Sequence, residues 1–380
     1  MQNRNIALNS DSGSDAEATQ AYSSPGMPAL DMGGRQVSAF EFWPMWLVYA
    51  PVVLQWLWLG LRYRSLSLPL IASPAVPLSG MVGVEKSRVM SLVSAASEQW
   101  FAPWVLIDAG PEQLAEALNR MRAAGIGFPV VGKPDIGCRG AGVKCLADEE
   151  ELAKYLDDCP GGAPLMLQAL SPWEPEAGVF YRRFPGESRG EIFSLALKYS
   201  PYIVGDGERT LGQLVADDPR AGDLTELYKS RHQQRWNDVL SEGEALRLVF
   251  SVSHCRGAIF RDGRQYITQA LCERLDQIFE DLPDYFYGRL DIKFADIERL
   301  MQGEDFQIIE INGASSEALH IWDRHARLGD ALRALFDQYH SLFEIGHRNR
   351  ARGHRPPGLI SLWRAWRRES RLVAQYPEND

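Results

Sequence analysis

The chain has 380 residues, a hydrophobic content of 45%, a charged content of 24% and a formal net charge of −10. These values are typical of a folded globular protein with room for two domains or one large composite domain. The negative charge argues against nucleic acid as the main partner, because such a partner requires a basic surface. The five cysteines are odd in number and lack C-x-x-C spacing, so they form neither a disulfide framework nor a zinc set. We therefore expect a reducing compartment and a cytoplasmic location.

Residues 1–38 are expected to form a disordered leader. They are rich in Ser, Asp, Gly and Ala and contain few apolar residues. They also lack the basic start followed by an apolar core that defines a signal peptide.

Residues 39–64 contain an unusually apolar segment. Its central part, 42–61, reads FWPMWLVYAPVVLQWLWLGL and carries no charge. As a helix it would be ~30 Å long, about the thickness of a bilayer core, although Pro51 would kink it. Arg62 and Arg64 follow directly, so a spanning helix would leave the rest of the chain in the cytoplasm. Two alternatives stay open, a helix embedded in one leaflet and a buried helix packed on the following domain.

Residues 346–380 form a basic tail that is expected to hold a second amphipathic helix at 359–373. Eight arginines and one glutamate occur between positions 346 and 373. On a helical wheel the apolar residues share one face, namely Leu359, Leu362, Trp363, Trp366 and Val373. The other face carries Arg364, Arg367, Arg368 and Arg371. This composition suits contact with an anionic membrane surface, and the alternative is a helix docked on its own domain.

Between these two segments the sequence predicts a mixture of strands and helices. Strands are expected at 66–72, 128–133, 143–146, 164–168, 178–183, 191–199, 202–204, 246–251, 258–260, 286–294 and 306–311. Helices are expected at 84–96, 111–124, 149–156 and 268–279, and capping boxes at Asp148 with Glu151 and at Thr210 with Gln213. The acidic and polar segment 216–244 shows no clear element. Because strands and helices do not alternate regularly, the predicted fold class is α+β rather than a doubly wound sheet.

The stretch VVGKPDIGCRGAGV, at 130–143, places Lys133 ahead of Gly137, Gly140 and Gly142. It is not a Walker A loop, in which the lysine follows the last glycine, and it is not the G-x-G-x-x-G dinucleotide fingerprint. Because it lies between two predicted strands, we expect a hairpin whose backbone N–H groups approach phosphates and which closes as a flap. The alternative is a plain glycine-rich turn.

Two later strands carry polar residues at every second position. In YGRLDIKF, Arg289, Asp291 and Lys293 share one face of the predicted strand. In IIEING, Glu310 and Asn312 share one face, and the two isoleucines at 309 and 311 are expected on the other. If the strands are neighbours, Asp291, Glu310 and Asn312 form an oxygen-rich cluster of the kind that holds magnesium together with nucleotide phosphates. The alternative is a charged, solvated face of a sheet.

The chain resembles the ATP-grasp enzymes, close to the D-alanine–D-alanine ligase and glutamate ligase branches. The blocks KPDIGCRGAGV, GRLDIK and IIEINGASSE stand in the order that the family shows. A fourth block, VGDGERTLGQLV, resembles a segment of the cyanophycin synthetase and glutathione synthetase relatives. The resemblance covers roughly positions 84–323.

The resemblance implies a set of site residues. ATP would be bound by Lys86, Lys133, Gly137, Arg139, Gly140, Gly142, Gln168, Glu176 and Lys198, with Gln168 near the adenine and Glu176 near the ribose. Asp291, Glu310 and Asn312 would hold Mg²⁺, with Mn²⁺ as an alternative ion. Arg289 and Lys198 would be catalytic. Lys198 would hold the phosphates, and Arg289 would stabilise the transferring phosphoryl group or the tetrahedral oxyanion.

The implied activity is an ATP- and magnesium-dependent ligation of a carboxylate to an amine through an acyl phosphate. The residues after Asn312, GASSE, depart from the D-alanine ligase pattern, so D-alanine specificity does not carry over. Two alternatives are a kinase-like phosphotransferase of the same fold and a membrane-tethered, non-catalytic nucleotide-binding module. The oligomeric state is left open, with a homodimer as one option. The implied division is a pre-ATP-grasp region at 65–127, a small subdomain with the flap at 128–205 and a large subdomain with the magnesium site at 206–345.

Overall fold

The computed structural model describes residues 22–377 except 34–35, 42, 139 and 281. Positions 1–21 and 34–35 of the predicted leader lie outside the described residues. The prediction of disorder is wrong for the rest of it, because Leu30 and Ser38 are buried. Helices and antiparallel strands are mixed along the chain, which confirms the predicted α+β class.

The described strands form three sheets whose neighbouring strands are all antiparallel. A four-stranded sheet has the order β1-β4-β2-β3, a five-stranded sheet the order β11-β10-β5-β6-β9, and β7 pairs with β8. The strands are β1 (Trp104–Asp108), β2 (Val130–Pro134), β3 (Lys144–Leu146), β4 (Pro164–Ala169), β5 (Glu176–Arg182), β6 (Glu191–Tyr199), β7 (Tyr202–Val204), β8 (Ala245–Arg247), β9 (Ile259–Asp262), β10 (Tyr287–Phe294) and β11 (Phe306–Asn312).

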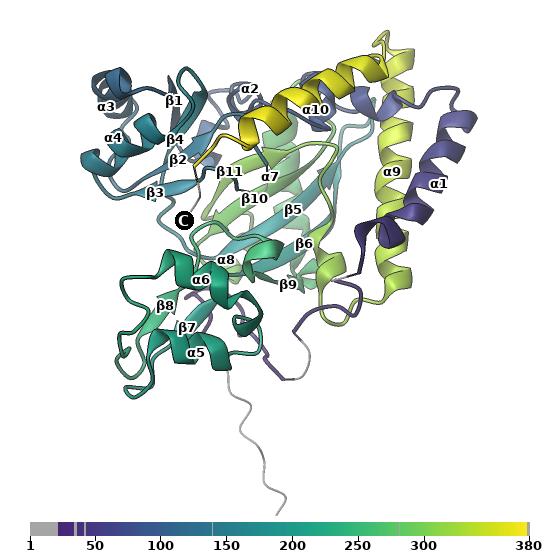
Figure 1. Cartoon of the computed structure of the whole chain (residues 1–380). Helices are drawn as coiled ribbons and strands as arrows, with labels where there is room; N and C mark the ends of the chain where they lie inside the picture. The colour runs from purple at the N-terminus through teal and green to yellow at the C-terminus, as the bar shows by residue number, and fades with distance from the viewer. Residues whose placement is uncertain (1–21, 34–35, 42, 139, 281, 378–380) are drawn as a thin grey trace, which may run out of the picture.

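The helices cover the sheets and the outer side of the molecule (Figure 1). They are α1 (Met45–Arg62), α2 (Lys86–Met90), α3 (Leu114–Ala123), α4 (Glu149–Asp158), α5 (Leu211–Asp217), α6 (Thr225–Arg231), α7 (Gln269–Glu280), α8 (Ile297–Met301), α9 (Leu328–Ala351) and α10 (Leu359–Val373). In Figure 1 the four-stranded sheet with α3 and α4 lies at the upper left and the β7–β8 pair with α5 and α6 at the lower left. The five-stranded sheet is central, and α9 and α1 lie at the right.

The five-stranded sheet is buried on one face and carries the cavity described below on the other. Because side chains alternate along a strand, Val179 and Phe180 of β5 point to opposite faces. Val179 packs in a core with Leu275 of α7, whereas Phe180 packs with Leu335 of α9. The face toward α9 is thus only partly filled by apolar side chains, since Arg289 lies opposite Phe180 in the register of β10 and β5.

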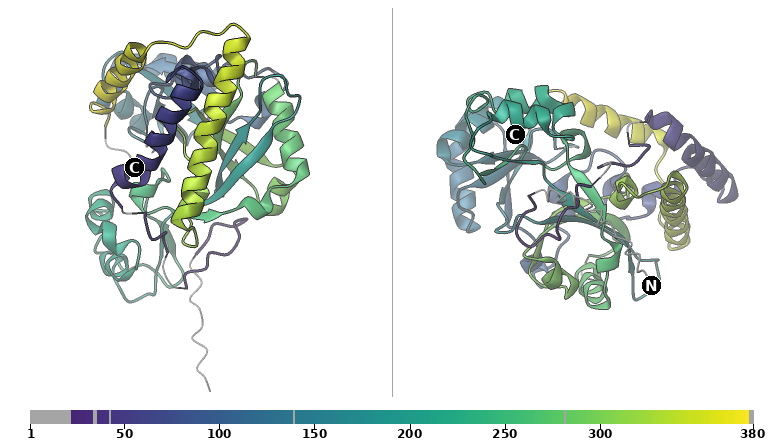
Figure 2. Two further views of the ribbon diagram at one scale, coloured as in Figure 1. Left: turned by 90° about the vertical axis from the view of Figure 1, so that its right-hand side faces the viewer. Right: turned by 90° about the horizontal axis from the view of Figure 1, so that it is seen from below.

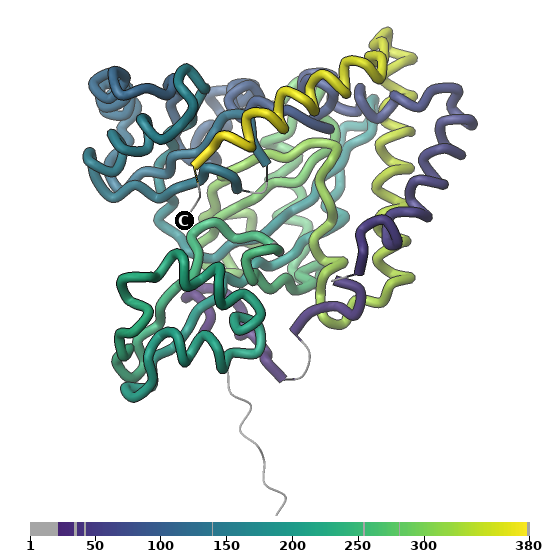
Figure 3. Tube along the Cα trace, viewed as in Figure 1, coloured from purple at the N-terminus to yellow at the C-terminus, as the bar shows by residue number. Residues whose placement is uncertain are grey.

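Helix α1 packs along α9, although about 280 residues separate some of their contacts (Figure 3). Val48, Val52 and Leu59 are buried, and the Trp56 and Phe343 rings meet edge to face at 5.2 Å between centroids. Among the residues that the structure describes, no helix combines the length and the apolar character needed to cross a bilayer. This finding contradicts the spanning alternative for the segment 42–61.

Most predicted elements are confirmed with small shifts at their ends, and β6 and α10 have the predicted bounds. Asp148 accepts a hydrogen bond from the Glu151 backbone N–H, and Thr210 with Gln213 forms a complete capping box. The unassigned segment 216–244 contains α6 and packs around the buried side chain of Tyr228.

Three predicted elements are wrong in type or length. The expected strand at 66–72 contains a 3₁₀ helix, Leu68–Ile71, because Pro69 favours a helical first turn. The expected helix at 84–96 ends at Met90. The following Leu92 and Val93 N–H groups bond only three residues back, in turns. The expected strand at 246–251 ends at Arg247, whose guanidinium donates to the carbonyls of Val249 and Phe250 at 2.8 and 2.7 Å and bends the chain.

Candidate functional site

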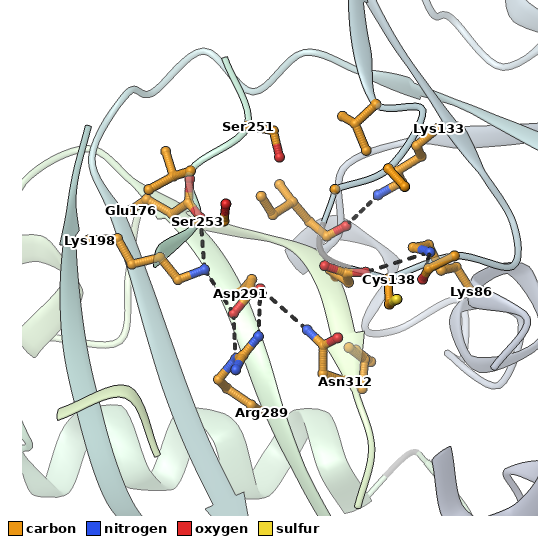
Figure 4. Close-up of a pocket in the computed structure, with 18 of the residues that line it drawn as sticks. Lys86, Lys133, Cys138, Glu176, Lys198, Ser251, Ser253, Arg289, Asp291 and Asn312 are labelled. Atoms are coloured by element: carbon orange, nitrogen blue, oxygen red, sulfur yellow. Dashed lines mark hydrogen bonds and ion pairs between the residues drawn. The ribbon is translucent and has the colours of Figure 1, made fainter. Parts of the chain in front are cut away.

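A cavity of about 720 Å³ lies between the four-stranded sheet, the five-stranded sheet and the loop that follows β8. Its wall includes side chains from β2, β6, β10 and β11, namely Lys133, Lys198, Asp291 and Glu310. Figure 4 shows Lys133 and Lys86 on one side of the cavity, with Lys198, Glu176 and Arg289 on the other. All the described ATP-site residues expected from the sequence line it except Gly142. Arg139, which was expected in the flap, lies outside the described residues.

The polar face of β10 points into this cavity as predicted. Arg289, Asp291 and Lys293 line the cavity, whereas Leu290 and Ile292 are buried in the core beneath the sheet. The alternation follows from the pleat of the strand.

The three expected metal ligands lie together because β10 and β11 are neighbours. Asp291 lies opposite Glu310, and Asn312 lies opposite Arg289. The Asn312 side-chain amide donates to Asp291 Oδ2 at 3.3 Å. The sequence thus identified which residues meet, through the pairing of the two strands.

The expected orientation of Ile309 is wrong. The pairing shifts from Asp291 opposite Glu310 to Ile292 opposite Ile308, which leaves Ile309 as an extra residue. Such a bulge locally breaks the alternation of faces. Ile309 is therefore only half-buried at the cavity wall, whereas Ile311 packs in the core, and the Ile309 carbonyl oxygen becomes available to a side chain.

That side chain is Lys133 from the entering strand of the glycine loop. Its Nζ donates to Gln168 Oε1 at 2.8 Å and to the Ile309 carbonyl at 2.9 Å. Burial lowers the pKa of Lys133 to about 8, although the nearby Glu310 carboxylate opposes the shift. Lys133 therefore links the four-stranded sheet to β11 of the five-stranded sheet. Its ammonium group loses its proton more readily than that of an ordinary lysine.

At the other side of the cavity, a second cluster of charged side chains forms ion pairs among its own members. Lys198 Nζ lies 2.9 Å from Glu176 Oε1 and 3.1 Å from Asp291 Oδ1, and Arg289 Nε donates to Asp291 Oδ1 at 2.9 Å. Burial alone would lower the pKa of Lys198, but the Asp291 and Glu176 carboxylates outweigh it and raise the pKa. Burial would raise the pKa of Asp291, but Arg289 and Lys198 lower it. All four groups are therefore ionised at neutral pH.

Lys86 stands at the base of the flap. Its Nζ donates to the carbonyls of Pro134 at 3.2 Å and Gly137 at 3.1 Å, and it lies 3.8 Å from Glu310 Oε1. These contacts hold the start of the glycine loop close to β11.

The glycines of the flap are required by backbone geometry and close packing. Gly140 has φ +72°, and a Cβ there would lie 2.5 Å from Ser251 Oγ. Gly142 has φ +69°, and its Cβ would lie 2.8 Å from Pro134 Cγ. The loop after β8 therefore touches the flap directly. Any residue with a Cβ at Gly140 or Gly142 would push away the neighbouring atoms and strain the backbone.

The expected metal ligands suit magnesium in number and chemistry. Within the described part of the chain, no three His, Cys, Asp or Glu residues are grouped as a metal site. The expected set contains only two carboxylates, Asp291 and Glu310, with the Asn312 amide. Magnesium uses such small oxygen sets when substrate phosphates and water complete its octahedron, so the residues fit a metal that arrives with a nucleotide.

Two cavity residues were not selected from the sequence. Lys293 Nζ lies 2.9 Å from Glu176 Oε2, and the alternation along β10 contained the signal for it. Glu317 accepts hydrogen bonds from the Tyr49 hydroxyl and, at 3.3 Å, from Trp322 Nε1. Burial raises the pKa of Glu317. Its only signal was the departure from the family pattern in GASSE.

The chain is similar to several solved structures of known ligases. No family model matches the chain, and no curated protein sequence matches it. The similar solved structures include a bifunctional glutathione synthetase from Pasteurella multocida, with 14% identity over 67% of this chain and 36% of that chain and a TM-score of 0.34. They also include the VanG D-Ala:D-Ser ligase from Enterococcus faecalis, with 12% identity over 70% and 62% of the two chains and a TM-score of 0.38.

A D-alanine–D-alanine ligase from Bacillus anthracis complexed with ATP is a further similar structure, with 14% identity over 71% of this chain and 68% of that chain and a TM-score of 0.38. The chain thus spans about a third of the glutathione synthetase and just under two thirds of VanG.

Proposed function

We propose that this chain is an ATP- and divalent-metal-dependent ligase that joins a carboxylate to an amine through an acyl phosphate. The observation that supports this most is the convergence of Lys133 and Lys198, from two different sheets, on the cavity that holds Asp291, Glu310 and Asn312. Cations on two sides and oxygen donors between them match the charge pattern of a metal-bound triphosphate.

Binding of the nucleotide relies on side chains that already point into the cavity. Lys133 supplies positive charge beneath the flap, and Lys198 supplies it from β6. When ATP enters, its phosphates would replace the Ile309 carbonyl and the Gln168 amide oxygen as the partners of Lys133. The backbone N–H groups of the flap would add uncharged hydrogen-bond donors to the phosphates.

A divalent cation would be held by Asp291, Glu310 and Asn312, and when bound it neutralises charge on the phosphate oxygens. For Asp291 this requires that its oxygens be shared with Lys198 and Arg289. Glu176 was expected at the ribose, but its two oxygens already bond Lys198 and Lys293. We propose that Glu176 mainly orients these lysines.

The chemistry needs no protein nucleophile. A substrate carboxylate oxygen attacks the γ-phosphorus, the bond to the β-γ bridging oxygen breaks, and ADP and an acyl phosphate form. The amine then attacks the acyl carbon, phosphate departs with the bonding electrons, and the nitrogen loses a proton. The protein contributes position and charge, and Arg289 is placed to stabilise the transferring phosphoryl group or the oxyanion of the second step.

The acceptor amine would be received at the end of the cavity where Glu317 lies. The Arg289 guanidinium donates to the Glu317 backbone carbonyl at 3.4 Å, so this carboxyl group borders the reacting centre. A carboxyl group with a raised pKa can hold an ammonium ion and accept its proton before attack.

The test is ADP and phosphate release by the purified chain with mixtures of carboxylates and amines. Lys133→Ala and Glu310→Ala should each lower turnover by about 10²-fold or more, since each removes a charge that contacts phosphate or metal. Lys154→Ala, on the exposed face of α4, is the matched control and should leave turnover unchanged. Parent-like turnover in both site variants would refute the assignment.

The same assay separates the two alternatives. A phosphotransferase would leave the γ-phosphate on a stable product instead of releasing it. A non-catalytic nucleotide-binding module would bind ATP without forming ADP under any substrate mixture.

A further inference from the structure

Helix α1 exposes a long apolar stripe on the side away from α9. The exposed fraction is 71% for Trp46, 68% for Leu54 and 80% for Leu61. Further exposed side chains on the same helix are Val53, Leu57 and Trp58. These positions repeat with helical spacing, and the sequence from 43 to 61 contains no charged residue.

This stripe is held in place by the opposite side of the helix. Val48, Val52 and Leu59 are buried, and Tyr63 at the end of α1 donates to Glu344 of α9 at 2.9 Å. The helix therefore has a fixed inner face, and its outer apolar face contributes nothing to the core. Contiguous apolar surface of this kind marks an interaction site.

Helix α10 presents a second exposed surface with a different chemistry. Its inner side is half-buried through Leu362 and Ala365, and Ala365 lies against Gly83. The predicted apolar face is thus divided, because Leu362 and Val373 turn inward while Leu359, Trp363 and Trp366 are exposed. Arg364, Arg367 and Arg371 are exposed as well.

Tryptophan and arginine are paired on both helices. Arg367 lies over the Trp363 ring at 5.1 Å, and Arg62 lies over the Trp58 ring at 5.4 Å. Side chains with an apolar body and a polar end favour the boundary between lipid tails and headgroups. The right-hand view of Figure 2 shows α10 and α1 following one another along one edge of the molecule.

The charge distribution indicates what kind of partner binds this surface. The whole chain has a net charge of −10, yet the segment 346–373 has eight arginines and one glutamate. Of the α10 arginines, Arg368 is bound to Glu85 at 3.2 Å. A two-fold contact with a second copy would bring the same arginines face to face, which is unfavourable. Anionic lipid headgroups neutralise them while the lipid tails receive the leucines and tryptophans.

We propose that the exposed faces of α1 and α10 dock this protein on an anionic lipid bilayer, with both helices lying in the interface. This inference goes beyond the proposed ligase activity and does not depend on it. The docked surface adjoins the cavity, because Met45 of α1 and Glu369 of α10 both line it.

The experiment is sedimentation of the full chain with phosphatidylcholine vesicles that contain or lack phosphatidylglycerol. We expect binding only to the anionic vesicles and a marked decrease at high salt. The double variant Leu54→Ser/Leu61→Ser should bind the vesicles at least about tenfold more weakly than the parent, since two exposed leucines no longer enter the lipid. The triple variant Arg364→Gln/Arg367→Gln/Arg371→Gln should lose the preference for anionic lipid.

Two matched controls keep the test decisive. Val239→Ser changes an apolar side chain that is 51% exposed outside both helices, and Arg333→Gln changes an arginine side chain that is 79% exposed on α9. Both controls should bind as the parent does, and thermal melts should show that every variant is folded. The proposal is overturned if the parent does not bind anionic vesicles or if the controls lose as much vesicle binding as the double and triple variants. It is also overturned if sedimentation velocity shows a dimer that Leu54→Ser/Leu61→Ser abolishes.

Discussion

Glu317 is a carboxyl group in a largely apolar corner of the cavity, where Tyr49 and Trp322 donate to it. Burial raises its pKa above the ordinary value of 4.5. The folded state therefore resists ionisation, and its stability falls as the pH rises from about 4.5 through the raised pKa. We expect Glu317→Gln to increase the melting temperature at pH 7 and to leave it unchanged at pH 4, where both states carry the neutral acid.

Thermal melts across this pH range measure the effect. Glu150→Gln, on the exposed face of α4, is the control and should keep the pH dependence of the parent. A Glu317→Gln protein that is equally destabilised at both pH values would show that hydrogen-bond geometry, not ionisation, dominates at this position.

Lys133 offers a second test at the level of one side chain. Burial lowers its pKa to about 8 in the free protein. Triphosphate charge beside it would raise that pKa, so ATP binding near pH 8 should take up about half a proton at Lys133. Below pH 7 the uptake at this lysine should disappear, because the amine is already charged.

Titration calorimetry in two buffers with different ionisation enthalpies measures this uptake. Lys133→Met should remove it and weaken ATP binding, while Lys154→Met should change neither. If the parent takes up no proton near pH 8, Lys133 does not contact the phosphates.

Among the elements, the glycine flap is the one whose backbone conformation is most restricted. Gly140 combines a positive φ of +72° with a Cβ position 2.5 Å from Ser251 Oγ. Gly140→Ala should therefore displace the flap from the loop after β8 and lower ATP turnover by about tenfold or more, through both strain and contact. The matched control is Gly161→Ala, since a Cβ at Gly161 meets nothing within 4 Å. Steady-state assays should show the control turning over ATP at the parent rate, and parent-like turnover in Gly140→Ala would remove the flap from the site.

The sequence predicted the elements whose pattern is local. The alternation of Arg289, Asp291 and Lys293 with apolar residues defined both β10 and the face that carries the site. Asp148 and Thr210 located the starts of α4 and α5 because a capping side chain bonds a backbone N–H only three residues away.

Features that depend on distant segments were not predicted. The bulge that turns Ile309 into the cavity depends on pairing with β10, and no residue type marks it. Tyr228 and Leu240 organise the segment 216–244 through contacts with β7 and the residues after β8, so they show no helical or strand period. The alternation along β10 placed Lys293 on the polar face, but its partner Glu176 and the contact of Glu317 with Tyr49 follow only from the fold.

At the scale of the whole molecule, the cavity lies between two sheets that are connected by side chains of the site. Lys133 crosses between them, and Lys86 ties the flap to β11 through Glu310. Both bridges use the cations that the proposed reaction needs for phosphate. If these ammonium groups bind phosphate as proposed, we expect nucleotide binding to weaken or replace the contacts that join the two sheets.

The arrangement also connects the cavity to the two exposed helices. Tyr49 of α1 bonds Glu317 at the acceptor end, while Tyr376, just after α10, donates to the Ile136 carbonyl at the base of the flap at 2.8 Å. Docking of α1 and α10 on a bilayer would place the cavity entrance near the headgroups. The substrate best suited to this position is a carboxylate or an amine carried by an amphiphile.

We therefore expect ATP turnover with a long-chain carboxylate or amine to be several-fold faster when the compound is in anionic vesicles than when no vesicles are present. Docking concentrates enzyme and substrate on one surface. Leu54→Ser/Leu61→Ser should lose this stimulation and keep the vesicle-free rate, since neither leucine lines the cavity. ADP release with and without vesicles measures both quantities. Stimulation that survives in the double variant would show that the bilayer acts only as a reservoir of substrate, and equal rates in the parent with and without vesicles would assign the cavity to water-soluble substrates.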